Sequence, residues 1–237
     1  MSLRDAWEAE ARNWIAWART PGHDSYWRFH RDAFLPSLPP PPCRVVDVGC
    51  GEGRLPRDLK LRGYDVIGVD GSRTLIEAAR EADPTGRYEV ADAAALPLAD
   101  ASVDLVTAFM SFQDVDDLDG AFREAARMLV WGGHLRSAIV HPVSSAGDVR
   151  ASEHDEVFEI RGSYFEDRRY SETFERNGLT MTFASHHRSI QRVARAILEA
   201  GLLIDHVAEV EDTADPPGSL WRRIPPFLHI GAVKPRA

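Results

Sequence analysis

The stretch VVDVGCGEG (Val45–Gly53) places a short β-branched run directly before three glycines at alternate positions. β-Branched residues favour strands, and glycine allows a tight turn in which backbone N–H groups approach a ligand without a Cβ in the way. The segment that follows, Gly53–Gly63, has leucines at a spacing typical of a helix. The stretch therefore predicts a strand, a turn suited to ligand binding and a helix in succession.

The same alternation of strand and helix continues on the C-terminal side of this stretch. Apolar runs predict strands at 43–49, 64–70, 88–92, 103–110, 134–141, 202–210 and 227–235, with helices at 74–82, 118–129 and 189–201 between some of them. The first five strands are apolar along their whole length, which is typical of a parallel sheet covered by helices on both faces. We expect an α/β fold, a doubly wound and mostly parallel seven-stranded sheet.

The chain divides into four parts within one expected domain. Residues 1–42 are predicted to form an N-terminal helical lid that ends in a proline run, and 43–141 the cofactor-binding half. Residues 142–186 interrupt the alternation and are expected to form an insert on the substrate side, in which Asn177-Gly178 indicates a hairpin. Residues 187–237 supply the closing helix and strands.

Composition excludes several classes of partner. The 237 residues carry a net charge of −9, which disfavours binding to nucleic acid or to anionic membranes. No stretch of about 18 apolar residues is present, and the charged N-terminus does not resemble a secretory signal. We therefore expect a cytoplasmic protein without membrane or nucleic-acid partners, acting as a monomer or homodimer.

Counting separates the glycine-rich turn from two familiar nucleotide-binding motifs. The dinucleotide fingerprint that starts at Gly49 requires a third glycine at position 54, where Arg54 stands, and no Gly-Lys-Ser/Thr follows for a phosphate-binding loop. Asp70 ends the second strand 21 positions after Gly49, where doubly wound folds place an acid that takes ribose hydroxyls. Asp92, after the third strand, is placed to accept a hydrogen bond from an adenine amino group.

Four stretches taken together, VVDVGCGEG, IGVDGS, VADAAALPLADASVDLV and ARMLVWGGHL, span about residues 43 to 140. In this order they resemble the class I S-adenosylmethionine-dependent methyltransferases, and within them the small-molecule branch of ubiquinone/menaquinone-type, methyltransferase type 11-like enzymes. The resemblance implies a Rossmann-like fold, S-adenosyl-L-methionine as methyl donor and S-adenosyl-L-homocysteine as product. It also implies that the cofactor site is formed by Asp47, Gly49, Cys50, Gly51, Asp70, Gly71, Asp92, Ala93 and Met110.

The acceptor side rests on the expectation that ligands bind outside the carboxyl ends of the strands. On that basis Gln113 is a candidate substrate-binding residue; Tyr26 of the N-terminal lid and Tyr164 of the insert are further candidates, as aromatic walls of the acceptor pocket. His141 and His187 are candidate bases, because histidine titrates near neutral pH; the alternative for each is a hydrogen-bonded structural histidine.

Three aspartates close to the fourth strand, Asp114, Asp116 and Asp117, raise the question of a metal site. We interpret them instead as caps of the helix that follows, and expect no metal.

The predicted function is methyl transfer from S-adenosylmethionine to a small organic metabolite by in-line displacement. Two alternatives stay open at this point: an NAD(P)-type oxidoreductase, and a non-catalytic protein that binds S-adenosylmethionine. The identity of the acceptor does not follow from the sequence.

Overall fold

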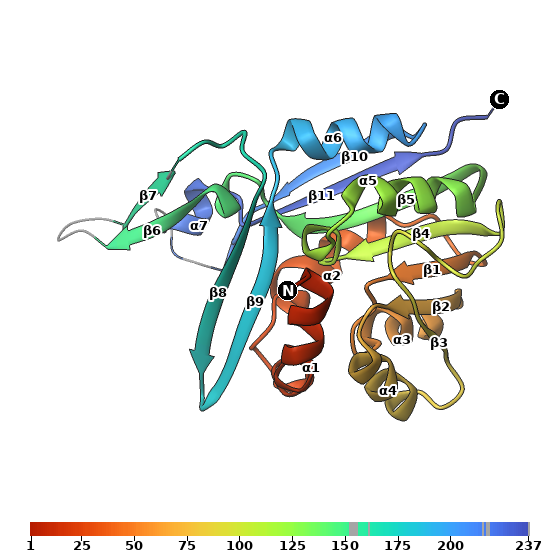
Figure 1. The fold of residues 1–237 in the computed structure, drawn as a ribbon, viewed down its shortest axis with the longest axis horizontal. Helices are drawn as coiled ribbons and strands as arrows, with labels where there is room; N and C mark the ends of the chain where they lie inside the picture. Colours follow the sequence, from red (N-terminus) through yellow and green to blue (C-terminus); the bar gives the residue numbers. More distant parts are fainter. Residues whose placement is uncertain (152–155, 161, 215, 217–218, 237) are drawn as a thin grey trace.

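A computed structural model shows a three-layer α/β fold around a single mixed sheet (Figure 1). It describes residues 1–151, 156–160, 162–214, 216 and 219–236. The sheet contains β1 (Arg44–Val48), β2 (Asp65–Asp70), β3 (Arg87–Val90), β4 (Val103–Phe109), β5 (Leu129–Val140), β10 (Leu203–Val210) and β11 (Phe227–Val233). Their order is β10-β11-β5-β4-β1-β2-β3, and β11 alone among these described strands runs opposite to the others. The doubly wound, mostly parallel seven-stranded sheet predicted from the sequence is confirmed.

Helices cover both faces of this sheet because successive side chains of a strand point to opposite faces. On β1, Val45 packs with residues of α3, whereas Val46 packs with residues of α5 and α6. The helices are α1 (Leu3–Arg19), α2 (Arg31–Phe34), α3 (Arg54–Leu61), α4 (Arg73–Ala82), α5 (Leu118–Met128), α6 (Ile190–Glu199) and α7 (Leu220–Arg223). Burial on both faces explains why the sequence of these strands is apolar throughout.

The N-terminal segment is helical in two pieces. A capping box between Ser2 and Asp5 starts α1. The helix ends at Arg19, because Pro21 cannot continue it and Gly22 adopts a positive φ of 77°. Helical structure resumes in a π-helical turn, η1 (Tyr26–His30), followed by α2 and the 3₁₀ turn η2 (Leu35–Ser37).

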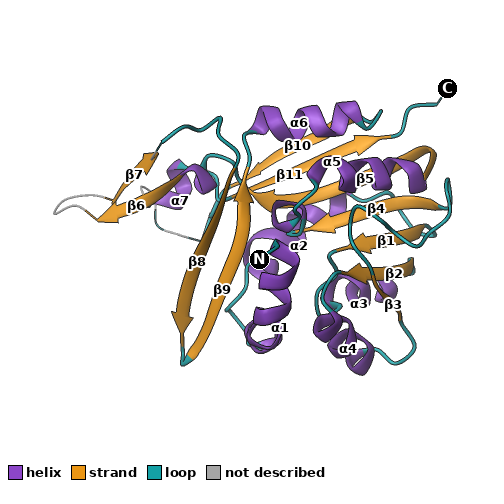
Figure 2. Ribbon diagram, viewed as in Figure 1, coloured by secondary structure: helices purple, strands orange, loops and turns teal. Residues whose placement is uncertain are grey.

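Two hairpins follow β5 and lie outside the sheet (Figure 2). After the short turn η4 (Ser144–Ala146), β6 (Gly147–Ala151) pairs with β7 (Glu156–Ile160), and β8 (Arg168–Arg176) pairs with β9 (Leu179–His187). Asn177 and Gly178 both adopt positive φ, which suits a two-residue hairpin turn. The hairpin predicted at this dipeptide is confirmed.

The β8–β9 hairpin and α1 lie side by side at the end of the sheet to which the parallel strands point (Figure 1). This arrangement encloses the space beyond the carboxyl ends of β1, β2 and β4. Within the described ranges, no helix is both long and apolar enough to cross a membrane.

Candidate cofactor and acceptor site

The glycine-rich turn after β1 is shaped by contact with the loop after β4. Gly49 adopts a φ of +75°, and a Cβ built on it would lie 2.3 Å from Cβ of Ser111. Ser111 is held there because its hydroxyl donates a 2.6 Å hydrogen bond to the carbonyl of Val48. Any side chain at position 49 would therefore displace either the turn or the β4 loop.

Asp70 is fixed at the end of β2 by two backbone donors. The N–H of Gly51 donates to Oδ2 and the N–H of Ser72 donates to Oδ1, both at 2.8 Å. Burial raises the pKa of this carboxyl, while the two N–H donors act in the opposite direction. Each oxygen keeps acceptor capacity for a further donor, which is what a pair of ribose hydroxyls supplies.

Asp47 lies beneath the turn and is only 1% exposed. The hydroxyl of Thr107 on β4 donates to its Oδ1 at 2.6 Å. Burial raises the pKa of Asp47 to about 7, and the neighbouring Asp70 adds to this shift. A carboxyl that is readily protonated at neutral pH can donate as well as accept a hydrogen bond.

Residues that follow β3 and β4 complete the site at the carboxyl ends of the strands. Asp92 is exposed, and its Oδ1 accepts a 2.8 Å hydrogen bond from the N–H of Ala94. Met110 has a φ of 52°, and its N–H donates to the carbonyl of Ala138 on β5. This left-handed residue directs the chain from β4 into η3 (Phe112–Asp114).

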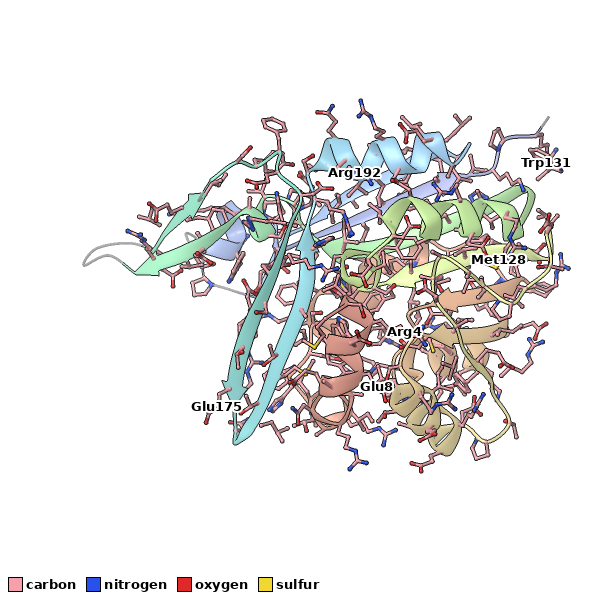
Figure 3. All side chains as sticks on the ribbon, viewed as in Figure 1. Arg4, Glu8, Met128, Trp131, Glu175 and Arg192 are labelled. Atoms are coloured by element: carbon pink, nitrogen blue, oxygen red, sulfur yellow. The ribbon has the colours of Figure 1, made fainter. Side chains whose placement is uncertain are left out.

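Helix α1 is fastened over this edge (Figure 3). Arg4 Nε donates to the carbonyl of Gly71 at 3.1 Å, and Glu8 accepts hydrogen bonds from the hydroxyls of Ser72 and Thr74. The indole nitrogen of Trp14 lies 3.2 Å from the place that a Cβ on Gly51 would take. The sequence did not point to Arg4 and Glu8, because nothing local indicates contacts with residues more than sixty positions away.

One cavity of about 980 Å³ joins the glycine-rich turn to the β8–β9 hairpin. All nine residues that the resemblance places at the cofactor line it: Asp47, Gly49, Cys50, Gly51, Asp70, Gly71, Asp92, Ala93 and Met110. Gln113 and Tyr26, predicted to lie near the acceptor, line the same cavity. Their roles remain predictions.

The cavity has an aromatic wall where α1 meets the β8–β9 hairpin, and Trp14 brings this wall up to the glycine-rich turn. Phe183 of β9 stands between three tryptophans of α1, with ring centroids 6.2 Å from Trp7, 6.0 Å from Trp14 and 6.2 Å from Trp17. Phe174 of β8 adds a further edge-to-face contact at 5.7 Å. Such rings bury apolar surface and exclude water from a bound ligand.

A polar group stands beside this wall. Ser185 of β9 donates a 2.5 Å hydrogen bond to Oδ1 of Asp114, and Tyr170 lies opposite Ser185 across the hairpin. Burial raises the pKa of Asp114 well above its ordinary value and also raises the pKa of Glu172. Asp114, Tyr170, Glu172 and Ser185 all line the cavity. The sequence did not reveal the functional potential of Tyr170 and Glu172, because alternate polar residues in a hairpin are also typical of an exposed ribbon.

Tyr26 and Gln113 present only part of their side chains to the cavity. The Tyr26 hydroxyl donates a 2.6 Å hydrogen bond to Asp58 of α3, so its ring rather than its hydroxyl is available. Gln113 donates through Nε2 to the carbonyl of Met110, at 2.8 Å.

Tyr164, His141 and His187 are not among the described residues that line the large cavity. The Nε2 atom of His141 pairs with Glu209 at 3.0 Å, and its Nδ1 accepts from the N–H of Val143. The Nδ1 atom of His187 pairs with the hydroxyl of Ser145, and its Nε2 with the carbonyl of Tyr164. Burial lowers the pKa of both imidazoles. These contacts favour the structural alternative, and a base role for either histidine stays a prediction.

The three aspartates after β4 have three different environments. Asp117 caps α5 by accepting from the N–H of Gly120, as predicted. The expectation that Asp114 and Asp116 are caps is wrong: Asp114 accepts from Ser185, and Asp116 pairs with Arg169 and accepts from the N–H of Leu3. Their spacing in the sequence gave no sign that the two hairpin residues would reach them. Within the described residues, no group of three or more histidine, cysteine or acidic side chains is arranged to hold a metal ion.

The geometry at the turn fits S-adenosylmethionine. The cradle around Gly49 and Gly51 admits a ligand only because no Cβ is present, and Asp70 has free acceptor positions at the end of β2. Met110 and the aromatic wall line the same cavity, whose volume of about 980 Å³ leaves room for a second ligand beside one at the turn.

Comparison with known proteins defines the class. Residues 46–136 match the family described as methyltransferase domain. The chain is 37% identical over 114 residues to a malonyl-acyl-carrier protein O-methyltransferase of Enterobacter lignolyticus, which covers 48% of this chain and 45% of that protein. It is also 37% identical over 120 residues to a demethylmenaquinone methyltransferase of Thermus thermophilus, covering 48% and 54%. The chain thus spans about half the length of these curated relatives.

A solved structure extends the likeness to most of the chain. The S-adenosylmethionine-dependent methyltransferase of Mesorhizobium loti superposes with a TM-score of 0.73 and 28% identity, covering 85% of this chain and 96% of that one. Residues 46–136 are thus similar to a methyltransferase domain, and most of the chain is similar in fold to an S-adenosylmethionine-dependent methyltransferase. The resemblance stated from the sequence motifs is confirmed.

Proposed function

We propose that this protein transfers the methyl group of S-adenosylmethionine to a small organic acceptor. The observation that carries the proposal is the single cavity of about 980 Å³ that holds both the glycine-rich turn with Asp70 and an aromatic wall. Bound there, S-adenosylmethionine supplies an electrophilic methyl on a positively charged sulfur. The protein's part is to position the acceptor close to that methyl and to exclude water from the space between them.

Cofactor binding is the first test. Calorimetry should detect S-adenosylmethionine or S-adenosylhomocysteine binding with a micromolar Kd, about −7 to −9 kcal/mol. Asp70→Ala should weaken binding by roughly 1.5–3 kcal/mol, because it removes an acceptor of charge-assisted hydrogen bonds. Asp65→Ala is the matched control, since Asp65 begins the same strand at the opposite edge of the sheet and is exposed. No binding to the wild-type protein, or equal losses in the two variants, would refute the proposal.

The two alternatives make different predictions with the same protein. An oxidoreductase would bind NAD(P)H. The sequence disfavours this alternative, because Arg54 stands where the dinucleotide fingerprint requires its third glycine. A non-catalytic protein would bind the cofactor but form no S-adenosylhomocysteine with any acceptor in a metabolite library. Methylated product detected by mass spectrometry would exclude both.

The acceptors in the names of the two relatives, malonyl-acyl-carrier protein and demethylmenaquinone, are substrates of those proteins and are not assigned to this one. The expectations that this protein acts in the cytoplasm, without nucleic acid and as a monomer or homodimer, stay predictions.

A further inference from the structure

We propose that the acceptor molecule carries an ammonium group on an apolar body, and that Asp114 and Glu172 bind this ammonium as a recognition group beside the aromatic wall. The inference rests on the proposed function and names the substrate class of the same site. Three observations support it: the register of the β8–β9 hairpin, the unpartnered Oε1 atom of Gln113 among the described residues, and the distribution of charge around the cavity.

The hairpin register brings the two carboxylates to neighbouring positions. Tyr170 pairs with Ser185, and Glu172 pairs with Phe183, so the two pairs are successive steps on the inner face of one ladder. Ser185 holds Asp114 at 2.5 Å, which places this carboxylate at the first step and Glu172 at the second. Tyr170 lies between them: after burial, the charges of Asp114 and Glu172 are the largest causes that raise its pKa.

Gln113 provides a second, independent indication of a donor ligand. Its side chain is 9% exposed and lines the cavity. The Nε2 atom donates to Met110 and to Asp114, but Oε1 is buried and has no hydrogen-bond partner within the described residues. An unpartnered buried acceptor is unfavourable, and a ligand N–H would supply the missing hydrogen bond.

The cations of the lining are engaged elsewhere. Arg54 pairs with Asp24, Arg4 donates to the carbonyl of Gly71, and Arg176 donates to the carbonyl of Gly22 near the hairpin tip. No ion pair of Asp114 or Glu172 occurs within the part of the chain that the structure describes. Arg188 is the nearby cation that acts on Asp114, but its guanidinium donates to the carbonyls of Phe112 and Val115.

Asp114 and Glu172 thus face the same cavity without an ion pair among the described residues; Asp114 is partly buried and Glu172 is exposed. Burial raises the pKa of both carboxyls, and the charge of Asp148, which also lines the cavity, raises that of Glu172 further. An ammonium group would relieve this repulsion. The adjacent rings of Phe183, Trp7 and Trp14 add the faces that attract a cation and bury its apolar body.

The same charges disfavour an anionic acceptor. A carboxylate placed against Asp114 and Glu172 would meet like charge, which disfavours its binding there. On this basis the acceptor differs in charge from a malonyl group, the acceptor named for one of the relatives.

Matched ligands test the inference with the full-length protein saturated with S-adenosylhomocysteine. One trio is 2-phenylethylamine, 3-phenylpropionate and 2-phenylethanol; a second, larger trio is tryptamine, indole-3-propionate and tryptophol. Binding is measured by calorimetry. In at least one trio the amine should bind tenfold or more tightly than its carboxylate, and more tightly than its alcohol.

Variants assign the preference to the two carboxylates. Asp114→Asn removes the charge but keeps the shape of the side chain and an oxygen that accepts from Ser185. Glu172→Gln removes the charge of Glu172 on β8 in the same way. The double variant should lose the tenfold preference for the amine and still bind S-adenosylhomocysteine. Glu175→Gln is the matched control on the same strand, because Glu175 is exposed and does not line the cavity; it should keep the full preference (Figure 3).

The outcomes separate this inference from the proposed function. If S-adenosylhomocysteine binds but no amine is preferred in either trio, or the preference survives in the double variant, the inference is wrong and the methyltransferase proposal stands. If S-adenosylhomocysteine does not bind, the methyltransferase proposal itself is refuted and this inference with it. Thermal melting of each variant, compared with Glu175→Gln, shows whether a loss reflects unfolding.

Discussion

Gly49 is the residue at which the fold and the candidate site depend most directly on one another. Its positive φ turns the chain out of β1, and its missing side chain makes room for Ser111 of the β4 loop. Gly22 has nearly the same φ, +77° against +75°, but has no heavy atom within 4 Å of its ideal Cβ position. The two glycines thus have the same left-handed backbone conformation, but only Gly49 has atoms close to the position that a Cβ would take.

This pair allows the contact to be separated from the backbone cost. We expect Gly22→Ala to lower the free energy of unfolding by about 1 kcal/mol, the usual cost of a left-handed conformation in a residue with a Cβ. Gly49→Ala should cost roughly 1–3 kcal/mol more, because the overlap with Ser111 forces a shift of the turn. Urea unfolding followed by tryptophan fluorescence measures both. Equal losses would show that the β4 loop yields freely to the added methyl.

The same scale shows what sequence could and could not predict about side chains. Motif positions located nine residues that line one cavity, because a glycine turn and acids at strand ends are local signals. His141 was expected there too, but side chains alternate along β5: Val140 lines the cavity and His141 does not. Asp114 reaches the hairpin through Ser185, a hydrogen bond between residues 71 positions apart that no local pattern contains.

Among the elements, α5 offers a direct test of the interpretation of Asp117 as a cap. Its carboxylate accepts from the N–H of Gly120 at 2.8 Å, and its side chain is 57% exposed. Asp117→Ala should lower the free energy of unfolding by about 1 kcal/mol, the usual value of an N-cap, and leave cofactor affinity unchanged. Methyl transfer by the wild-type protein should also persist in EDTA.

The opposite result would reassign this residue. Activity lost in EDTA and restored by Mg²⁺, together with an Asp117→Ala variant that binds cofactor but is inactive, would indicate a metal ligand. Asp100→Ala is a suitable control: this carboxylate is exposed, pairs with Arg127 and does not line the cavity.

Elements with their own periodicity were the predictable part of the fold. The strands and helices between 43 and 141 and the closing strands followed from apolar runs and glycine turns, and the Asn177-Gly178 hairpin from its turn chemistry. The side-by-side arrangement of α1 and β9 did not follow from any local pattern. One of its contacts is the hydrogen bond that the indole nitrogen of Trp7 donates to the carbonyl of Ala184 at 3.0 Å.

At the scale of the whole molecule, the N-terminal segment is fastened to the sheet by a buried pair of histidines. His30 of η1 is 0% exposed and His229 of β11 is 1% exposed, and His30 Nδ1 lies 2.9 Å from His229 Nε2. Phe109, Phe227 and Phe34 surround the pair. One ring donates and the other accepts, so at least one must stay neutral.

Burial therefore opposes protonation of both rings. It lowers the pKa of His30 well below its ordinary value and that of His229 to about 4, with further repulsion from His229 and His206 respectively. In the unfolded chain these histidines bind protons near pH 6.5, so between pH 6.5 and 4 the unfolded state holds more protons. Stability from this pair is complete above pH 6.5 and falls with pH down to about 4.

Other groups in the protein act in the opposite direction. Burial raises the pKa of Asp47 to about 7 and also that of Asp70, and such carboxyls destabilise the folded state as pH rises between their unfolded and folded pKa values. The pH profile of the wild-type protein alone therefore cannot isolate the histidine pair. A difference between two proteins that share the carboxyls can.

His229→Gln supplies that difference, because glutamine keeps a polar side chain of similar length but does not titrate. We measure the free energy of urea unfolding at pH 7 and pH 4.5 for both proteins. From pH 7 to pH 4.5 the free energy of unfolding should fall by roughly 2–3 kcal/mol more in the wild type than in His229→Gln, at about 1.4 kcal/mol per pKa unit. His134→Gln is the control for the loss of a histidine as such, because His134 pairs with Asp205 nearer the surface. Parallel pH profiles for the wild type and His229→Gln would show that protonation of His229 does not lower the free energy of unfolding. Burial of the histidine pair would then not determine how firmly η1 is held against β11.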